Sequence, residues 1–294
     1  MGVYINVGNA GFQSARNGEY VDKSLLIAAI NSTLYTERRF SCVSRCRRFG
    51  KSLAAKMLCA YYDQSCDSHS LFDDLKIASD KSYEQHRNKY PVIYLDLTGF
   101  VTRQETDIAK KLDASLLSDI SLAYPDIPVK SDDKLVNYLL RVSETKGQQF
   151  IFIIDEWDAI CREYEPDTKE MDLYVNWLRA LFKSSDAIRI FAGVYMTGIL
   201  PIKKYKTQSA LNNFTEYSMI IPGRLAGFFG FTKTEVQSLC LKHNMDFREF
   251  EIEQIHRKEY KGKVTQYDGQ VILVGINYDS KTKKRECKIE YVNN

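Results

Sequence analysis

The chain has 294 residues, 44% of them hydrophobic and 27% charged, which suits a globular protein with one large or two modest domains. A formal net charge of +3 is nearly neutral and gives no general reason to expect binding to nucleic acid or to a membrane. No signal peptide opens the sequence and its apolar runs are too short to span a bilayer, so a cytoplasmic protein is expected.

The cysteines and histidines form no recognisable disulfide framework or metal site. The seven cysteines are odd in number and have no paired C-x-x-C spacing, which indicates reduced, mostly buried thiols. The four histidines are scattered along the chain, so we expect no dedicated zinc site.

Strands and helices are predicted to alternate along the chain. Asp22 is placed to cap a helix over 23–30. Buried strands joined by helical crossovers predict an α/β fold with a five-stranded, mainly parallel sheet. The strands are expected at residues 40–44, 91–97, 150–155, 188–195 and 217–221.

The turn after the first of these strands is the most informative segment. Residues 40–52 read FSCVSRCRRFGKS, and a helix over 53–62 follows. This is most of the phosphate-binding pattern G-x-x-x-x-G-K-[ST], with Arg45 at the position of the first glycine. In this geometry the turn and the helix N-terminus bind an anion, Lys51 contributes a positive charge, and the Ser52 hydroxyl ligates Mg²⁺. The alternative is a basic turn before an ordinary helix.

The third strand ends in two acids, Asp155 and Glu156. An apolar run over 150–154 is typical of a buried strand of a parallel sheet, so both acids are expected at its carboxyl end. Asp155 would hold Mg²⁺, directly or indirectly, and Glu156 would polarise the attacking water. Such a strand alone is usually structural, but together with the turn at 45–52 it predicts a nucleotide site.

Further polar groups are expected at the same edge of the sheet, where ligands of parallel sheets bind. Thr197 is a candidate sensor of the γ-phosphate or the attacking water, although a Thr-Gly pair is also an ordinary turn. Arg224 is either a charge-stabilising finger, within the chain or across a subunit contact, or a surface arginine. Asp96 is either close to the metal or a solvated strand end. The arginines around 38–48 suit the phosphates of a nucleotide better than a polynucleotide backbone.

Seven blocks of the sequence together resemble the bacterial AAA-ATPase-like family, over roughly residues 1–247. The blocks are YVDKS at 20–24, SRCRRFGKS at 44–52, PVIYLDL at 91–97, FIFIIDEWD at 150–158, TGILPIKKY at 197–205, SALNNFTEYSM at 209–219 and FFGFTKTEV at 228–236. In this family an arginine is usual at the position of Arg45, whereas Cys46 stands where proline is usual.

The resemblance implies a P-loop NTPase three-layer sandwich of the additional-strand type that binds ATP and Mg²⁺. We expect a slow or regulated Mg²⁺-dependent ATPase that acts as a nucleotide switch. A second copy of the chain is a further candidate partner. The expected catalytic residues are Glu156, Thr197 and Arg224, the metal ligands Ser52 and Asp155, and the nucleotide-binding residues Arg45, Arg47, Arg48, Phe49, Gly50, Lys51, Ser52 and Leu53.

Family members usually continue into a C-terminal nuclease-like domain of the PD-(D/E)XK type, and here the chain departs from them. Its tail resembles the last helix, over 249–260, and the final strands, at 270–277 and 285–292, of such a domain without a credible metal-binding pair. We expect an N-terminal segment at 1–39, the ATPase core at 40–226, a truncated helical lid at 227–248 and a remnant of the nuclease-like domain at 249–294. An ATP-coupled nuclease and a non-catalytic scaffold are the two alternative functions.

Overall fold

Our computed structural model describes residues 2–102, 107–164, 168–202, 211–244, 271–278 and 285–292 of the chain. The chain divides into two compact units, Met1–Leu225 and Ala226–Asn294. No helix within the described ranges is both long enough and apolar enough to cross a lipid bilayer.

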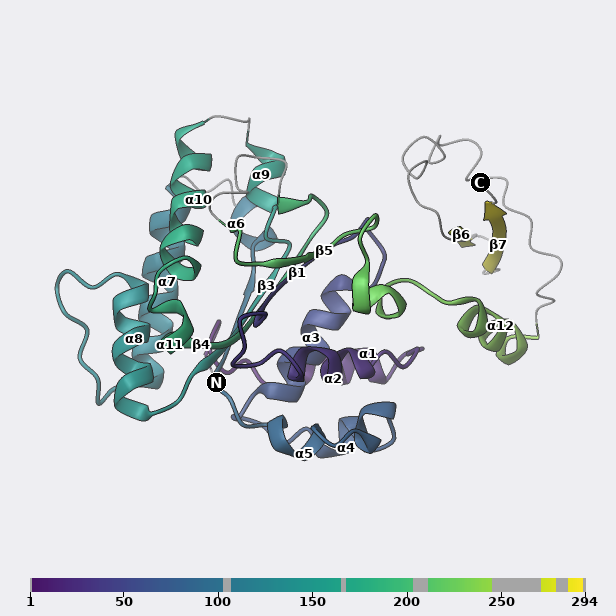
Figure 1. The fold of residues 1–294 in the computed structure, drawn as a ribbon, viewed down its shortest axis with the longest axis horizontal. Helices are drawn as coiled ribbons and strands as arrows, with labels where there is room; N and C mark the ends of the chain where they lie inside the picture. The colour runs from purple at the N-terminus through teal and green to yellow at the C-terminus, as the bar shows by residue number, and fades with distance from the viewer. Residues whose placement is uncertain are drawn as a thin grey trace. The chain divides into compact units, whose positions relative to one another are not determined.

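The larger unit is built on a sheet whose described strands number five and all run parallel. Their order across the sheet is β2-β3-β4-β1-β5, so β4 lies between the strand that precedes the basic turn and the strand that ends in Asp155 (Figure 1). This confirms the predicted α/β fold class. The strands are β1 (Phe40–Ser44), β2 (Val92–Asp96), β3 (Phe150–Asp155), β4 (Phe191–Gly198) and β5 (Thr215–Tyr217).

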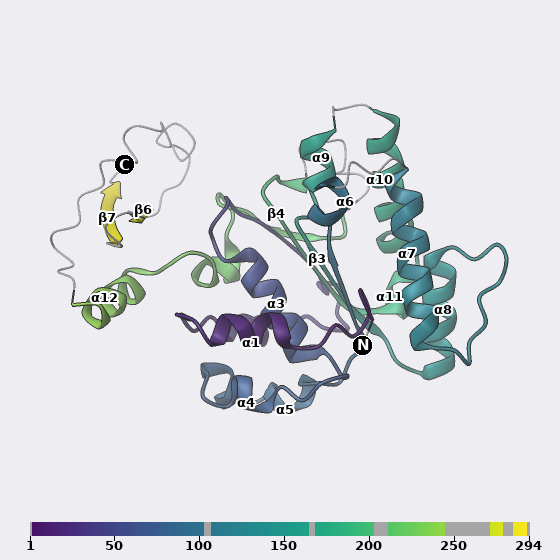
Figure 2. The same cartoon turned by 180° about the vertical axis from the view of Figure 1, so that it is seen from behind.

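Helices cover both faces of this sheet and complete the three layers. On one face, α3 contacts β2, β3 and β4, and α1 and α2 pack against α3. Figures 1 and 2 show α7, α8 and α10 on the opposite face. The described helices of this unit are α1 (Ala10–Arg16), α2 (Leu25–Asn31), α3 (Lys51–Tyr62), α4 (His69–Phe72), η1 (Lys76–Ser79), α5 (Tyr83–His86), α6 (Thr98–Thr102), α7 (Ile108–Ala123), α8 (Leu135–Lys146), α9 (Ala159–Glu163), α10 (Lys169–Phe182) and α11 (Ala187–Ile190), and η4 (Gly223–Phe228) begins in it.

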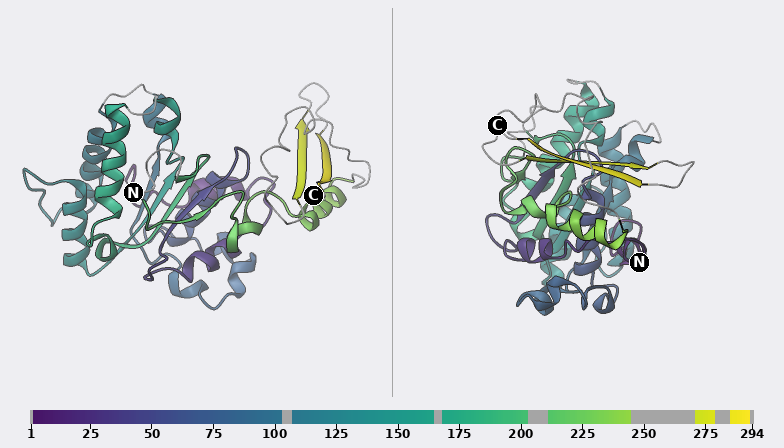
Figure 3. Two further views of the ribbon diagram at one scale, coloured as in Figure 1. Left: turned by 45° about the horizontal axis from the view of Figure 1, so that its top comes forward. Right: turned by 90° about the vertical axis from the view of Figure 1, so that its right-hand side faces the viewer.

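The two faces of the sheet bury different side chains because side chains alternate along a strand. Phe152 and Ile154 belong to the large apolar cluster that includes the buried apolar residues of α7, α8 and α10. Ile153 is also buried but lies outside that cluster, on the face that α3 covers. Asp155 is two residues beyond Ile153, so the alternation places it on the α3 face. The left-hand view of Figure 3 shows the sheet between the two helical layers.

Two of the predicted strands are displaced along the sequence. The strand expected at 188–195 is Phe191–Gly198, because Ala187–Ile190 forms a short helix just before it. The strand expected at 217–221 is Thr215–Tyr217. The apolar residues Met219, Ile220 and Ile221 that suggested it are exposed on a turn in which the Ile221 N–H donates to the Ser218 hydroxyl.

Asp22 does not occupy the expected cap position. Helix α2 begins at Leu25, with Ser24 as its N-cap residue. The Asp22 carboxylate instead accepts hydrogen bonds from the N–H of Ser24 (2.8 Å) and of Lys76 (2.9 Å). Its role is to join the start of α2 to η1.

The smaller unit contains one described helix and a two-stranded hairpin. Helix α12 (Lys233–Lys242) begins with a capping box between Thr232 and Glu235, the arrangement that satisfies two backbone N–H groups at a helix start. Strands β6 (Val271–Tyr278) and β7 (Arg285–Val292) pair antiparallel, close to the predicted 270–277 and 285–292. The helix expected at 249–260 lies outside the described residues.

Candidate nucleotide site

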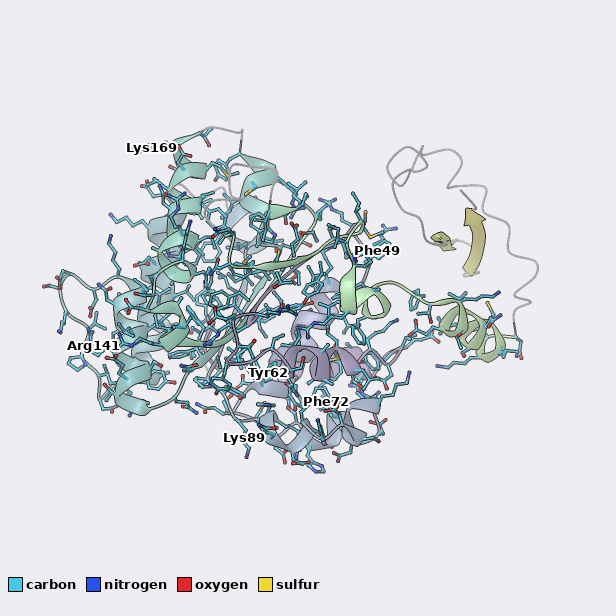
Figure 4. The ribbon with its side chains drawn as sticks, in the orientation of Figure 1. Phe49, Tyr62, Phe72, Lys89, Arg141 and Lys169 are labelled. Atoms are coloured by element: carbon cyan, nitrogen blue, oxygen red, sulfur yellow. The ribbon has the colours of Figure 1, made fainter. Side chains whose placement is uncertain are left out.

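The carboxyl ends of β1, β3 and β4 lie at one edge of the sheet. The register pairs Ser44 with Gly198 and Ile154 with Met196, so the basic turn, the two acids and Thr197 lie at or just beyond the ends of neighbouring strands. In Figure 4, Phe49 marks the turn at this edge, and Tyr62 lies at the far end of α3. The fold therefore brings together groups that are far apart in the sequence.

The turn between β1 and α3 presents backbone N–H groups at the start of a 12-residue helix. Gly50 has φ 79°, in the left-handed region that glycine adopts without steric cost, and Arg48 also has a positive φ of 69°. The first helical hydrogen bond runs from the Ala54 N–H to the Gly50 carbonyl (2.9 Å). The N–H groups of Lys51, Ser52 and Leu53 precede it, and such groups at a helix N-terminus form an anion site.

The Lys51 ammonium is buried at this edge. Only 4% of its side chain is exposed. Its Nζ donates to the Cys46 carbonyl (3.1 Å) and lies 3.7 Å from Oε1 of Glu156. An ammonium has three N–H donors, and a buried charge is costly unless it is fully paired. Within the described residues the Lys51 ammonium makes this one hydrogen bond and this one ion pair, so it retains capacity to bind a further anion.

Asp155 is buried and has a donor for each carboxylate oxygen. The Thr197 hydroxyl donates to Oδ1, and the Tyr94 hydroxyl donates to Oδ2 over 3.4 Å. Burial, and then the Asp155 charge, raise the pKa of Tyr94 above its usual value, so that its hydroxyl stays protonated and can donate. A carboxylate has about four lone-pair sites, so these bonds leave acceptor capacity for a hydrated metal ion.

Glu156 lies between two cations. Its Oε1 faces Lys51, and its Oε2 is 2.5 Å from Nη2 of Arg162. Its backbone has a φ of 55°, unusual for a residue other than glycine, and its N–H donates to the Thr197 hydroxyl (3.2 Å). Burial raises the pKa of Glu156, and the charges of Lys51 and Arg162 oppose that shift. A carboxylate held in this way is a candidate proton acceptor.

Asp158 and Arg162 were not singled out from the sequence, yet both belong to this cluster. Asp158 is fully buried, and its Oδ2 accepts hydrogen bonds from the N–H groups of Ile199 (3.1 Å) and Leu200 (2.8 Å). Arg162 Nε lies 3.4 Å from the same oxygen. The only sequence signal for this pair was that Asp158 and Arg162 carry opposite charges at positions i and i+4.

Arg45 lies in the turn, but its side chain is directed into the protein. The residue is 3% exposed, and its Nη1 donates to the Tyr217 carbonyl (3.1 Å). Its N–H donates to the Gly198 carbonyl (3.0 Å). These contacts anchor the turn to β4 and β5.

The other predicted nucleotide-binding residues differ in exposure. Arg47 and Arg48 are exposed, and their side chains make no hydrogen bond or ion pair with any residue that the structure describes. Phe49, Ser52 and Leu53 are partly buried.

The structure does not place Arg224 or Asp96 against the acids. Arg224 is exposed, and it donates to the Tyr217 hydroxyl (3.1 Å) and the Ser32 hydroxyl (2.9 Å). Asp96 is opposite Asp155 in the sheet, but its Oδ1 accepts from the N–H (2.9 Å) and hydroxyl (2.6 Å) of Thr98. Asp96 thus forms a local turn at the strand end.

Comparison with known proteins identifies the family of the chain. No curated protein matches the chain significantly. The family model described as predicted AAA-ATPase matches residues 7–207, which is more than half of the chain and includes the basic turn, both acids and Thr197. The chain therefore belongs to the AAA-ATPase-like family.

Proposed function

We propose that this protein binds ATP with Mg²⁺ at the sheet edge formed by Lys51, Asp155, Glu156 and Thr197, hydrolyses it slowly, and acts as a nucleotide-dependent switch. The observation that supports this most directly is the buried Lys51 ammonium, 3.7 Å from the Glu156 carboxylate at the N-terminus of α3. A phosphate-binding cation and a candidate catalytic acid meet there.

Phosphate binding is assigned to the turn and the start of α3. The N–H groups of Lys51, Ser52 and Leu53 and the Lys51 ammonium form an electropositive site for the β- and γ-phosphates. The exposed side chains of Arg47 and Arg48 add positive charge at the rim. Arg45 is assigned the different task of holding the turn in place.

Metal binding is assigned to Ser52 and Asp155. In the described part of the chain the Ser52 hydroxyl has no hydrogen-bond partner, and Asp155 keeps lone pairs beyond those used by Thr197 and Tyr94. Both are oxygen donors, which Mg²⁺ prefers. When bound, Mg²⁺ neutralises negative charge on the phosphates.

Glu156 is assigned the role of orienting and deprotonating the attacking water. Thr197 supports it, because one hydroxyl joins the Glu156 N–H to the Asp155 carboxylate and so fixes the two acids relative to each other. The same hydroxyl is also our candidate sensor of the γ-phosphate.

The contact between Lys51 and Glu156 supports a slow or regulated turnover. Each group neutralises part of the other's charge, and a phosphate that attracts Lys51 would weaken this contact. Nucleotide binding would then change the charge around Glu156, which is what a switch requires. We place this activity in residues 40–226 and regard 227–248 as a shortened lid and 249–294 as the remnant of a nuclease-like domain.

The Glu156→Gln substitution tests the proposal, because it keeps the shape of the side chain and removes its charge. We expect ATP binding to persist and phosphate release to fall by about 10²-fold or more. Arg189→Gln is the control for loss of a charged side chain. Arg189 pairs with Glu144 and Asp186 and lies just before the amino end of β4, whereas the site lies at the carboxyl end of that strand. Undiminished phosphate release in Glu156→Gln would assign the catalytic role to another residue.

A further inference from the structure

Arg162 contacts the proposed catalytic acid, Glu156, but has no role in the ATPase chemistry assigned above. It belongs to the short helix α9, directly after the strand that carries the two acids. Its Nη2 donates to Oε2 of Glu156 over 2.5 Å, with both side chains largely shielded from solvent at 18% and 17% exposure. A hydrogen bond between two charged groups is among the stronger polar contacts in a protein.

The two oxygens of Glu156 face different cations. Arg162 contacts Oε2, whereas Oε1 faces Lys51 and the start of α3. A carboxylate rotates freely about its last bond unless something holds one oxygen. With Oε2 held by Arg162, Oε1 stays directed toward the site where the phosphates are proposed to bind.

This contact becomes more important when a nucleotide is bound. In the proposed function Lys51 binds the phosphates. Of the two cations that now face Glu156, only one then remains beside it. Among the described residues, Arg162 is the other cation within ion-pair distance of Glu156. Without it, a partly buried carboxylate would be free to turn away from the reacting water.

Arg162 also contacts a second acid, Asp158. Asp158 is fully buried and lies 3.4 Å from Arg162 Nε. Asp158 is fixed in turn by the N–H groups of Ile199 and Leu200, which directly follow β4. The guanidinium therefore lies between two carboxylates, and the Asp158 carboxylate is itself fixed by the backbone just after β4.

We propose that Arg162 is a positioning residue for ATP hydrolysis, which holds Oε2 of Glu156 so that Oε1 faces the attacking water. The inference rests on the proposed function. It also assigns Asp158 the task of aligning Arg162.

The test is steady-state ATP hydrolysis by R162Q and R162K beside wild type and R189Q. R162Q removes the charge, and we expect kcat to fall about tenfold or more while KM for ATP changes by less than about threefold. R162K should recover part of kcat, because an ammonium keeps the charge but lacks the fork that reaches two carboxylates. R189Q should match wild type.

A double-mutant cycle with E156Q separates positioning from general damage. If Arg162 acts through Glu156, R162Q lowers kcat in the wild-type background and has little further effect in E156Q. An equal loss in both backgrounds would overturn the proposal in favour of a structural role. Should R162Q fail to unfold cooperatively, R162K replaces it in the same cycle, and an equal loss of kcat from R162K in the wild-type and E156Q backgrounds would overturn the proposal.

The wild-type measurement distinguishes failure of the proposed function from failure of the role of Arg162 alone. If the wild-type chain releases no phosphate, or if Lys51→Ala releases it equally fast, the proposed function and this inference are both overturned. Normal release in wild type with unchanged or faster release in R162Q would overturn the role of Arg162 alone.

Discussion

The Thr197 hydroxyl donates a hydrogen bond to Oδ1 of Asp155, although the two residues are 42 positions apart in the sequence. The same hydroxyl accepts a hydrogen bond from the N–H of Glu156. One side chain at the end of β4 therefore fixes both acids at the end of β3. The proposed metal ligand and the proposed catalytic acid share this support.

Replacement of Thr197 by valine removes the hydroxyl and keeps the branched shape. We expect kcat to fall about tenfold or more, and the free energy of unfolding to fall by about 1–3 kcal/mol because the buried acceptor on Asp155 loses a donor. Phosphate release and urea unfolding measure the two effects. Thr197→Ser retains the hydroxyl and should lie close to wild type in both; equal losses in the serine and valine variants would contradict this role.

Arg45 and Arg47 should respond differently to substitution. Arg45 is buried and anchors the turn to Tyr217, so Arg45→Gln should lower the free energy of unfolding by about 1–3 kcal/mol. Arg47 is exposed, so Arg47→Ala should leave stability within about 0.5 kcal/mol of wild type and weaken ATP binding at low salt. Thermal unfolding and ATP titration distinguish the two. Loss of stability in Arg47→Ala with none in Arg45→Gln would reverse the assignment.

Gly198 lies where a side chain has no room. A Cβ atom there would lie 2.6 Å from Trp157 Nε1 and 2.8 Å from Oδ1 of Asp158. Gly198→Ala should therefore displace Trp157 and lower the free energy of unfolding by about 1–3 kcal/mol. A changed tryptophan emission spectrum would accompany the loss. Gly99→Ala is a control for the added methyl group because a Cβ there meets nothing within 4 Å. Wild-type stability and emission in Gly198→Ala would show that the strand end adapts.

His86 should make stability depend on pH. It is buried, its Nδ1 lies 2.7 Å from the Tyr90 hydroxyl, and burial lowers the pKa of its imidazole. In the unfolded chain the pKa returns to about 6.5, so below that pH the unfolded state binds a proton that the folded state does not. The contribution of His86 to stability is thus present above about pH 6.5 and is lost as the pH falls toward the folded pKa.

The measurement is urea unfolding at about pH 7.5 and about pH 5.5. His86→Gln should lose less stability between these two values than wild type does. His69 is exposed and pairs with Asp73 on the surface, so His69→Gln serves as the matched histidine control. The same pH dependence in wild type and His86→Gln would contradict the assignment.

The residues that the sequence could identify all lie next to a strand end or a helix start. Lys51 begins α3, Asp155 ends β3, and Thr197 lies near the end of β4. Since parallel strands bring their carboxyl ends to one edge, the order of elements was enough to predict that these residues converge. The α/β fold class followed from the same alternation and is confirmed.

The remaining contacts depend on side-chain direction, which the pattern does not contain. Arg45 and Arg47 are two basic residues of one turn, and only the structure shows that Arg45 is directed toward the Tyr217 carbonyl. Arg162 is a charged residue on a short helix, and its pairing with Glu156 depends on the turn that Glu156 makes with a positive φ. The start of β4 was misplaced because a short apolar helix and a buried strand have the same composition.

The most direct test of the nucleotide site is equilibrium binding of a fluorescent ATP analogue with Mg²⁺ to wild type and to Lys51→Ala, with phosphate release followed on the same samples. The account predicts that wild type binds the analogue and releases phosphate slowly, and that Lys51→Ala does neither while its thermal unfolding stays cooperative. Equal affinity in the two proteins, or no binding by a folded wild-type chain, would contradict it.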